Sequence, residues 1–277
     1  MDEGSRILVV TPTLGESPHL DEAVGRVAAL RVPVLHVISA PAAKVRGLKE
    51  RFPWTRVVPD AGRPAGLYGA LNAALEAVPE GWGWFTYIND DDLLLPGFAE
   101  LAGRHASLRD PERVAYGDVE VIREDGLVVS RVTTERNPAW IPALLQQGIS
   151  PLMQQGMLFH REAAARLARF DTRYRLCADL DFWLRAYAGG DRFRHYPLPV
   201  ARFRIRPGQL SSDTAQTIRE QDEIVRRHLP ARVPAAARVF ARWRYRLCNL
   251  PRYLGRMRSI GLRTSYQMLA SGAAAQK

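Results

Sequence analysis

Residues 84–96 read WFTYINDDDLLLP, in which the apolar run Trp84–Ile88 leads into Asn89 and three consecutive aspartates, Asp90, Asp91 and Asp92. A short, continuous apolar run of this kind is typical of a strand buried on both faces of a parallel sheet. Ligands of open α/β sheets bind beyond the carboxyl ends of the strands. The acidic triplet is therefore predicted to lie where such a protein binds its ligand.

Upstream of this stretch, short apolar runs alternate with segments long enough for helices. We expect strands over residues 6–11, 34–38 and 55–58, and helices over 18–30, 41–52 and 68–78. Strands separated by helices favour right-handed βαβ units, which build a twisted parallel sheet with helices on both faces.

Downstream of residue 108 the pattern changes. Two strand-like runs, 115–122 and 127–132, flank the turn Glu124-Asp125-Gly126 and predict a hairpin. Further expected elements are strands over 157–159 and 200–205, helices over 161–168 and 179–188, and a polar helix that ends at residue 228. The sequence thus predicts one α/β domain with a mixed sheet over residues 1–230, followed by an appended tail, 231–277.

The composition is that of an ordinary globular protein, with 277 residues, 47% hydrophobic, 25% charged and two cysteines. It excludes collagen, a disulfide scaffold and a disordered acidic chain. Cys177 and Cys248 belong to no metal-binding spacing, so we expect both to be reduced and structural. Because the chain has no apolar run long enough to span a bilayer and its first residues lack the pattern of a secretory signal, we expect a cytoplasmic protein.

The net charge of +10 resides in the tail. Residues 231–277 contain nine Arg and Lys277 but no Asp or Glu, which leaves residues 1–230 formally neutral. Apolar tail residues recur at spacings of three and four, as in an amphipathic helix, with a break at Asn249 and Pro251; they are Val239, Trp243, Leu247, Leu250, Leu254 and Met257. Such a helix can lie on the inner face of an anionic membrane. It can equally pack on its own domain or on a second subunit of a homo-oligomer.

Three adjacent carboxylates repel one another, so a folded protein tolerates them best where water or a cation compensates. A hard divalent ion such as Mg²⁺ or Mn²⁺ takes oxygen ligands and is commonly held by one or two carboxylates together with substrate phosphates. The alternative is a solvated turn in which Asp92 caps a helix that starts near Pro96.

Three segments, in order along the chain, resemble motifs of the family 2 glycosyltransferases of GT-A fold. Residues 88–96 resemble the DxD segment, residues 66–75 (GLYGALNAAL) the glycine/tyrosine/Ala-x-Asn helix, and residues 170–174 with 178–185 the acidic motif on the acceptor side. The resemblance implies a GT-A mixed sheet flanked by helices, with a nucleotide-binding half over 1–108 and an acceptor-binding half over 109–230. It also implies an inverting, metal-dependent enzyme of the hexosyltransferase type. Such an enzyme moves a sugar from a nucleoside-diphosphate-sugar to a hydroxyl of a saccharide or lipid-linked acceptor, in bacterial surface polysaccharide or glycolipid assembly.

The resemblance also assigns donor-side roles. It implies that Asp91 binds Mn²⁺ or Mg²⁺, with Asp92 as a second candidate ligand, and that Asn89 and Asp90 contact the ribose or sugar-phosphate. Asn89 stands where many relatives have an aspartate, which leaves the division of labour around Asp91 open. Further expected donor contacts are Thr11, Pro12, Thr13, Arg63, Tyr68, Asn72 and Arg206. For Arg63 the alternative is a solvated loop arginine. The nucleotide base stays open because the second strand is followed by Ser39-Ala40-Pro41 rather than by the acidic residues that many relatives have there.

On the acceptor side, Asp179 matches the proposed general base of the family. The alternative is that Asp179 merely caps a helix, where Asp is a favoured residue. Asp181 lies two positions further and points elsewhere on a helix, as a structural residue or an acceptor contact. Trp183 either stacks on a sugar or belongs to the core.

Two rival functions are compatible with parts of the sequence. A nucleic-acid-binding protein would use the Arg-rich tail, but it leaves the acidic triplet unexplained, so we expect no nucleic-acid partner. A sugar nucleotidyltransferase would need a glycine-rich basic loop after the first strand, and residues 11–16 (TPTLGE) are not one. A non-catalytic relative that binds sugar nucleotides remains an alternative.

Overall fold

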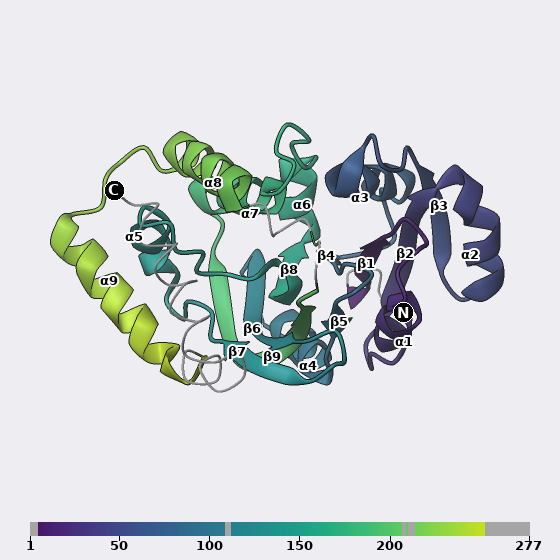
Figure 1. Cartoon of the computed structure of the whole chain (residues 1–277), viewed down its shortest axis with the longest axis horizontal. Coiled ribbons are helices and arrows are strands. Elements are labelled where there is room, and N and C mark those ends of the chain that lie inside the picture. Colours follow the sequence, from purple (N-terminus) through teal and green to yellow (C-terminus); the bar gives the residue numbers. More distant parts are fainter. Residues whose placement is uncertain (1–4, 109–111, 207–208, 210–213, 253–277) are drawn as a thin grey trace.

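The computed structural model describes residues 5–108, 112–206, 209 and 214–252. Within them, nine strands form one mixed sheet in the order β3-β2-β1-β4-β8-β6-β9-β5, with β7 paired to β6 (Figure 1). The strands are β1 Ile7–Pro12, β2 Val34–Pro41, β3 Arg56–Asp60, β4 Trp84–Tyr87, β5 Leu93–Leu94, β6 Val114–Ile122, β7 Val128–Val132, β8 Met157–His160 and β9 Phe193–Arg204.

Helices flank this sheet (Figure 1). They are α1 Leu20–Ala28, α2 Val45–Arg51, α3 Gly66–Ala77, α4 Pro96–Ala106, α5 Ile141–Leu145, α6 Arg161–Leu167, α7 Ala178–Ala188, α8 Thr214–His228 and α9 Ala235–Cys248, with short 3-10 turns η2 Ala42–Lys44, η3 Pro138–Trp140 and η4 Gln154–Gly156. None of the described helices combines the length and hydrophobicity that a bilayer crossing requires.

The first half of the sheet is parallel, as predicted. β1 pairs in parallel with β2 and β4, and β2 with β3. Their register brings the carboxyl ends of these four strands to one edge of the sheet, where β1 ends at Pro12, β3 at Asp60 and β4 at Tyr87. The loops that carry Thr13, the acidic triplet and the start of α3 therefore meet at this edge.

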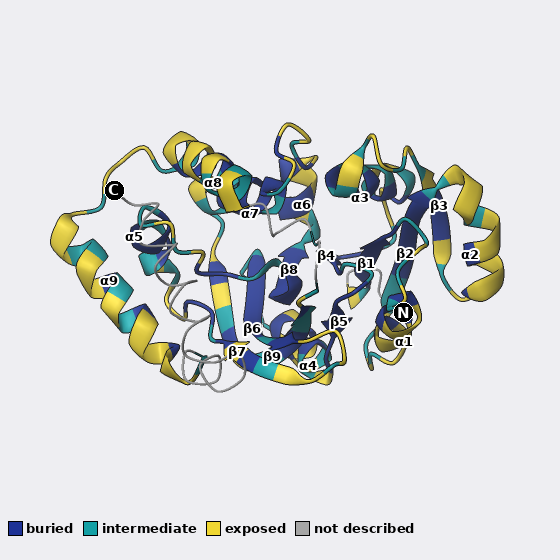
Figure 2. Ribbon diagram, viewed as in Figure 1, coloured by how far each residue is buried: buried dark blue, intermediate teal, exposed yellow. Residues whose placement is uncertain are grey.

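Side-chain alternation along the strands divides the core between the two faces of the sheet. On β1, Leu8 and Val10 join a cluster that includes residues of α3, α6, α7 and α8. Ile7 and Val9 join the opposite cluster, which includes residues of α4. Figure 2 shows that the central strands are mostly buried, that β3, β7 and β9 are partly exposed, and that the helices expose their outer faces. Two covered faces explain why β1 is apolar from Ile7 to Val10 and buried along its whole length.

The second half of the sheet confirms the predicted hairpin of β6 and β7, which are antiparallel. The last strand is longer than predicted: β9 begins at Phe193 instead of residue 200. The missed part contains Pro197 and Pro199, which argue against a central strand. It is tolerated because β5 pairs with β9 only at Arg202 and Ala201, so the earlier part of β9 pairs on one side, with β6.

The described part of the tail packs on the domain through one face of α9. Ala241 and Tyr245 of α9 contact Ala143 and Leu144 of α5. Beyond α9, the side-chain amide of Asn249 exchanges two hydrogen bonds of 2.9 Å with the backbone of Thr133. The predicted break falls at Asn249, where α9 ends, and Leu254 and Met257 lie outside the described residues.

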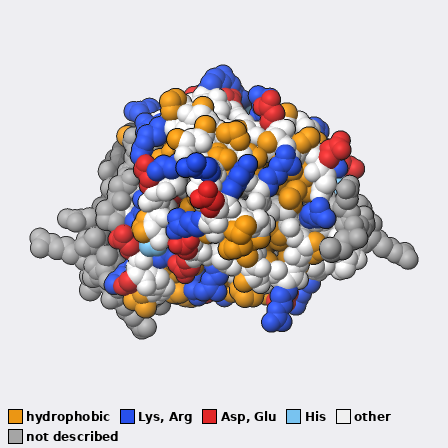
Figure 3. Space-filling model, turned by 90° about the vertical axis from the view of Figure 1, so that its right-hand side faces the viewer, with side chains coloured by type: hydrophobic (Ala, Val, Ile, Leu, Met, Phe, Trp, Pro, Cys, Tyr) orange, Lys and Arg blue, Asp and Glu red, His pale blue; other side chains and the backbone are white. Residues whose placement is uncertain are grey.

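Both cysteines are free, as predicted. The structural role predicted for Cys248 is wrong, because this residue is exposed whereas Cys177 is buried. Charged side chains of both signs intermingle with apolar ones on the end of the molecule that carries α2 and β3 (Figure 3), in keeping with the formal neutrality of residues 1–230.

The packing of α4 on β9 requires a glycine. A Cβ atom on Gly97 would collide with the carbonyl oxygen of Pro199, whereas no described atom lies within 4 Å of a Cβ on Gly103 of the same helix. We expect Gly97→Ala to lower the free energy of unfolding by about 1–3 kcal/mol because the backbone of β9 must shift. Gly103→Ala should raise it by up to about 1 kcal/mol through helix propensity. Urea denaturation of both variants checks this, and equal stability of the two would contradict it.

Candidate active site

The first strand and the acidic triplet meet through Thr13 and Asp90. The Thr13 hydroxyl donates a 2.5 Å hydrogen bond to Asp90 Oδ2, and Ser17 Oγ donates to the Asp90 carbonyl over 3.1 Å. Thr11 points elsewhere: its buried hydroxyl lies 2.9 Å from His36 Nε2. Of the residues predicted at the end of β1, Thr13 is thus the one that contacts the triplet, while Thr11 and Pro12 are buried.

Asp92 is fully buried, and three hydrogen bonds bind its carboxylate. Its carboxylate accepts hydrogen bonds from Asn89 Nδ2 (3.2 Å), Gln155 Nε2 (2.9 Å) and the backbone N–H of Arg204 (2.8 Å). Burial, reinforced by the neighbouring charge of Asp91, raises the pKa of Asp92 to about 7. The alternative that Asp92 caps the following helix is wrong, because the N-cap of α4 is Leu95. These contacts favour a structural role for Asp92, and metal binding by it stays a prediction.

Asp91 faces two arginines at the end of β9. Arg206 Nε donates to Asp91 Oδ2 over 2.5 Å, and buried Arg204 donates through Nε to the Asp91 carbonyl over 2.9 Å. Arg204 also donates to Glu22 Oε2 over 2.7 Å. The guanidinium of Arg206 therefore neutralises the carboxylate that the sequence assigns to a metal.

The oxygen atoms of Asp91 and Asn89 suit a hard divalent cation as ligands. The Asp91 side chain keeps 12% of its surface accessible, and Asn89 Oδ1 is buried without a hydrogen-bond partner among the described residues. Both are oxygen ligands of the kind that Mg²⁺ and Mn²⁺ take together with phosphate and water. No group of three or more His, Cys, Asp or Glu side chains in the described ranges is arranged to hold a metal by itself.

Asp179 lies in the first turn of α7 and is bound by Tyr68 of α3. The Tyr68 hydroxyl lies 3.0 Å from Asp179 Oδ1 and 2.9 Å from the Leu176 carbonyl oxygen, and it shares its proton between them. The N-cap of α7 is Cys177, two residues earlier, but the Asp179 carboxylate also accepts from the backbone N–H of Leu180 in the first turn, so both interpretations of Asp179 stay open here. Burial raises the pKa of the Asp179 carboxyl above its ordinary value. A carboxylate in this state takes up a proton more readily than an exposed aspartate.

Tyr87 lies near both carboxylate groups of the site, the acidic triplet and Asp179. Burial raises the pKa of its hydroxyl, and the charges of Asp179 and Asp92 raise it further. The same tyrosine lines a small cavity together with Asp179 and Trp183. The end of β4 thus lies beside both the acidic triplet and Asp179. Trp183 itself is buried, which confirms that it belongs to the core.

The loop before Asp179 is fixed by two side chains. Glu220 of α8 accepts backbone hydrogen bonds from Arg175, Leu176 and Cys177 over 2.8–3.0 Å. Asn72 of α3 exchanges hydrogen bonds of 2.8 and 2.9 Å with the backbone of Phe170. Asn72 thereby holds the acceptor-side loop, and its predicted contact with the donor stays a prediction. Glu220 cannot be predicted from the sequence, because a single glutamate in a polar helix carries no signal.

Two other predicted site residues have local partners. Asp181 is buried and binds Arg185 Nε and His228 Nε2, both over 2.8 Å, so the structure favours its structural alternative. Arg63 is exposed and pairs with Glu16 over 3.1 Å in the loops outside the edge of the sheet.

The structure also supplies the acidic residue that the sequence lacks after β2. In the register of β2 and β3, Pro41 pairs with Asp60. Asp60 Oδ2 accepts a 2.8 Å hydrogen bond from Ser39, and Oδ1 accepts one of 2.6 Å from the backbone N–H of Gly62. The carboxylate beside the end of the second strand thus comes from the third strand, which the order of residues along the chain does not reveal.

Comparisons with known proteins agree with this architecture. No protein-family model matches the chain, and no curated protein matches it. Among solved structures, S. aureus TarS with UDP-GlcNAc is similar with a TM-score of 0.60 and 15% identity, over 93% of this chain and 77% of that one. The mannosyltransferase PcManGT from Pyrobaculum calidifontis, solved with GDP-Man and Mn²⁺, gives 0.57 and 17%, over 97% and 79%. The chain therefore has the GT-A-like mixed α/β fold of these glycosyltransferases, as predicted.

The raised pKa of Asp179 predicts that its charge destabilises the folded protein. At neutral pH, Asp179→Asn should raise the free energy of unfolding by about 1 kcal/mol, because the amide needs less hydration and can still accept from Tyr68. The gain should shrink as the pH falls and the wild-type carboxyl becomes protonated. Thermal melts at several pH values check this expectation.

The matched control is Asp181→Asn, two residues along the same helix. It should lower the free energy of unfolding by roughly 1–3 kcal/mol, because it removes the charge that compensates Arg185. Equal destabilisation by the two substitutions would refute the assigned difference between the carboxylates.

Proposed function

We propose that this chain is an inverting, metal-dependent glycosyltransferase of family 2 that moves a sugar from a nucleoside diphosphate to a hydroxyl of a saccharide or lipid-linked acceptor. The observation that carries the proposal is the approach of two carboxylate groups to one strand end: β4 ends at Tyr87, which lines a small cavity with Asp179 of α7, and the acidic triplet follows Tyr87 after two residues. A sugar seated between them would have its diphosphate beside Asp91 and its acceptor face beside Asp179. The pathway we favour is assembly of a bacterial surface polysaccharide or glycolipid.

The donor half of the site binds the nucleotide through the ends of β1, β3 and β4. Thr13 and Asp90, already joined at 2.5 Å, present hydroxyl and carboxylate oxygens to the ribose. Asp60 and Ser39 lie beside β1 at the same edge and present hydrogen-bonding groups to the base.

The diphosphate half of the site is formed by Asp91, Asn89 and Arg206. When bound to Asp91 and Asn89, Mn²⁺ or Mg²⁺ would neutralise the charge that develops on the departing diphosphate. Arg206, which pairs with Asp91 in the structure, is then free to donate to a phosphate oxygen. The same guanidinium thus compensates the Asp91 carboxylate when no sugar nucleotide is bound and a phosphate group when one is bound.

Asp179 acts as the general base. The acceptor oxygen forms a bond to the anomeric carbon, its proton passes to the Asp179 carboxylate, and the bond from that carbon to the diphosphate oxygen breaks with its electron pair on the leaving group. A single displacement of this kind inverts the anomeric configuration. The Tyr68 hydroxyl donates a hydrogen bond to this carboxylate. Glu220 accepts a hydrogen bond from the loop that precedes Asp179.

Binding of nucleotides tests the donor site. We expect one of UDP, GDP and dTDP to bind the wild type in calorimetry with Mn²⁺, and Asp91→Ala to lose at least about tenfold in affinity, or about 1.4 kcal/mol, together with the metal dependence. Asp60→Ala should weaken binding while the metal dependence remains, because Asp60 lies at the base end of the site.

Glu80→Ala, which removes an exposed carboxylate at the amino end of β4, is the matched control and should bind as the wild type does. Absence of nucleotide binding under every metal condition would remove the transferase proposal. Binding without any turnover would favour the non-catalytic relative.

The pH dependence of turnover tests the role of Asp179. A base must be ionised, and burial raises the pKa of this carboxyl. The rate should therefore fall as the pH drops through a value above the ordinary pKa of aspartate, about 3.9. Asp179→Asn should lose roughly 10²–10⁴-fold in kcat at every pH and keep its nucleotide affinity. A variant that retains the wild-type rate and acid limb would exclude Asp179 as the base.

A further inference from the structure

One face of α9 is apolar and exposed. Four large apolar residues of α9, Val239, Phe240, Trp243 and Leu247, are between 45% and 66% exposed, and Leu250, just beyond the end of the helix, is 49% exposed. At about 100° per residue the four residues of α9 fall within an arc of about 100° on the helix. Clusters of large exposed apolar side chains mark interaction sites on soluble domains.

Apart from Phe240, whose ring packs on Trp140 at a centroid distance of 5.4 Å, this face is not required to hold α9 on the domain. The helix is fixed from the opposite side, where Ala241 and Tyr245 pack on α5. Gln147 donates a 2.7 Å hydrogen bond to the Arg238 carbonyl, and Arg244 pairs with Glu135. These contacts attach α9 to the domain, and the outward face of the helix stays exposed to solvent (Figure 2).

Positive charge surrounds the apolar face. Arg242 and Arg246 lie beside it on α9, and Arg246 is exposed. The whole of residues 231–277 contributes ten cations and no acidic residue. A partner of this surface must therefore combine an apolar layer with negative charge.

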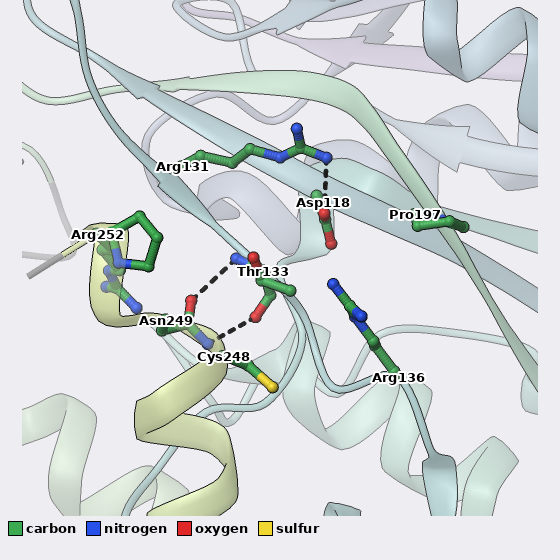
Figure 4. Close-up of a pocket in the computed structure, with 9 residues that line it drawn as sticks. Asp118, Arg131, Thr133, Arg136, Pro197, Cys248, Asn249 and Arg252 are labelled. Atoms are coloured by element: carbon green, nitrogen blue, oxygen red, sulfur yellow. Dashed lines mark hydrogen bonds and ion pairs between the residues drawn. The ribbon is translucent and has the colours of Figure 1, made fainter.

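A pocket at the carboxyl end of α9 adds a place for an anion (Figure 4). Its volume is about 340 Å³, and three arginines line it, namely Arg131 and Arg136 from the β7 region and Arg252 from the tail. Arg131 is paired with the buried carboxylate of Asp118 over 2.8 Å. The remaining guanidinium groups are placed to donate to phosphate oxygens.

We propose that α9 docks the protein on an anionic phospholipid bilayer, with its apolar face in the interfacial layer and a lipid phosphate in the arginine-lined pocket. A basic amphipathic helix that carries Trp, Phe and Leu binds such a surface through buried apolar area and through attraction to anionic headgroups. A second copy of the chain fits less well, because a two-fold contact through this face would oppose two arginine-rich helices. A nucleic acid would satisfy the arginines but leave Leu247 and Leu250 in water.

Sedimentation of the full chain with lipid vesicles tests the apolar half of the proposal. The wild type should bind vesicles of equal parts phosphatidylglycerol and phosphatidylcholine, and bind phosphatidylcholine alone at least about tenfold more weakly. The double substitution Trp243→Ser and Leu247→Ser should reduce binding to the anionic vesicles by about tenfold or more. Trp54→Ser removes a tryptophan that is 60% exposed near α2, and this control should bind as the wild type does.

The same vesicles test the charged half. Arg136→Gln with Arg252→Gln should weaken binding to anionic vesicles about thirtyfold, since each basic group at such a surface contributes about 1 kcal/mol and about 1.4 kcal/mol corresponds to tenfold. Arg46→Gln with Arg104→Gln, on α2 and α4, should have little effect. Unchanged thermal melts show that each variant folds, and because the surface lies outside the donor site, nucleotide binding and vesicle binding can fail independently.

Three results would overturn the proposal. The first is equal binding of the wild type to neutral and anionic vesicles, or binding to neither. The second is a dimer in analytical ultracentrifugation that the double substitution on α9 dissociates. The third is binding of a short RNA or DNA duplex more tightly than the vesicles, with loss in the arginine variants.

Discussion

The buried carboxylate of Asp92 is the constraint on which the candidate site depends. A carboxylate removed from water loses several kcal/mol of hydration, and here hydrogen bonds from Asn89, Gln155 and the Arg204 backbone offset that loss. These donors come from the loop after β4, from η4 and from the end of β9. Segments far apart in the sequence are thereby fixed around one side chain, and the two preceding aspartates are left at the edge of the sheet.

Two arginines supply the positive charge beside the acidic triplet. Arg204 is almost completely buried, and its guanidinium donates to the Asp91 carbonyl, to Glu22 and to the Glu124 carbonyl. Because its hydrogen-bonding groups are used in this way, Arg204 is a structural counter-charge. Arg206, two residues further, is 40% exposed in its side chain and pairs with the Asp91 carboxylate itself. The difference in burial separates a cation that holds the loop from one that can exchange partners.

The sequence predicts the parallel half of the fold to within a few residues because both faces of that sheet are covered, so strands such as β1 begin with a continuous apolar run, Ile7 to Val10. The prediction from the sequence fails where a strand pairs with a neighbouring strand on one side only. The first part of β9 contains Pro197 and Pro199, and only the long-range pairing with β6 makes it a strand. The side chains that point to chemistry, Asp90, Asp91 and Asp179, are recognisable as motifs. Their supports, Glu220 and Gln155, are not, because a hydrogen bond across 43 or 63 residues leaves no local pattern.

Asp60 shows most clearly why a site has to be built in space. Along the chain, Ser39-Ala40-Pro41 follows the second strand predicted from the sequence, so the proposed base-binding end of the site has no carboxylate in that segment. Parallel strands bring residues of different segments to the same depth of the sheet, however, and Asp60 on β3 lies beside the end of β2 and binds Ser39. The position of the charge relative to the nucleotide is what recognition requires, and either strand can supply it. The same reasoning applies to Tyr68 and Asp179, which are 111 residues apart and yet share one hydrogen bond.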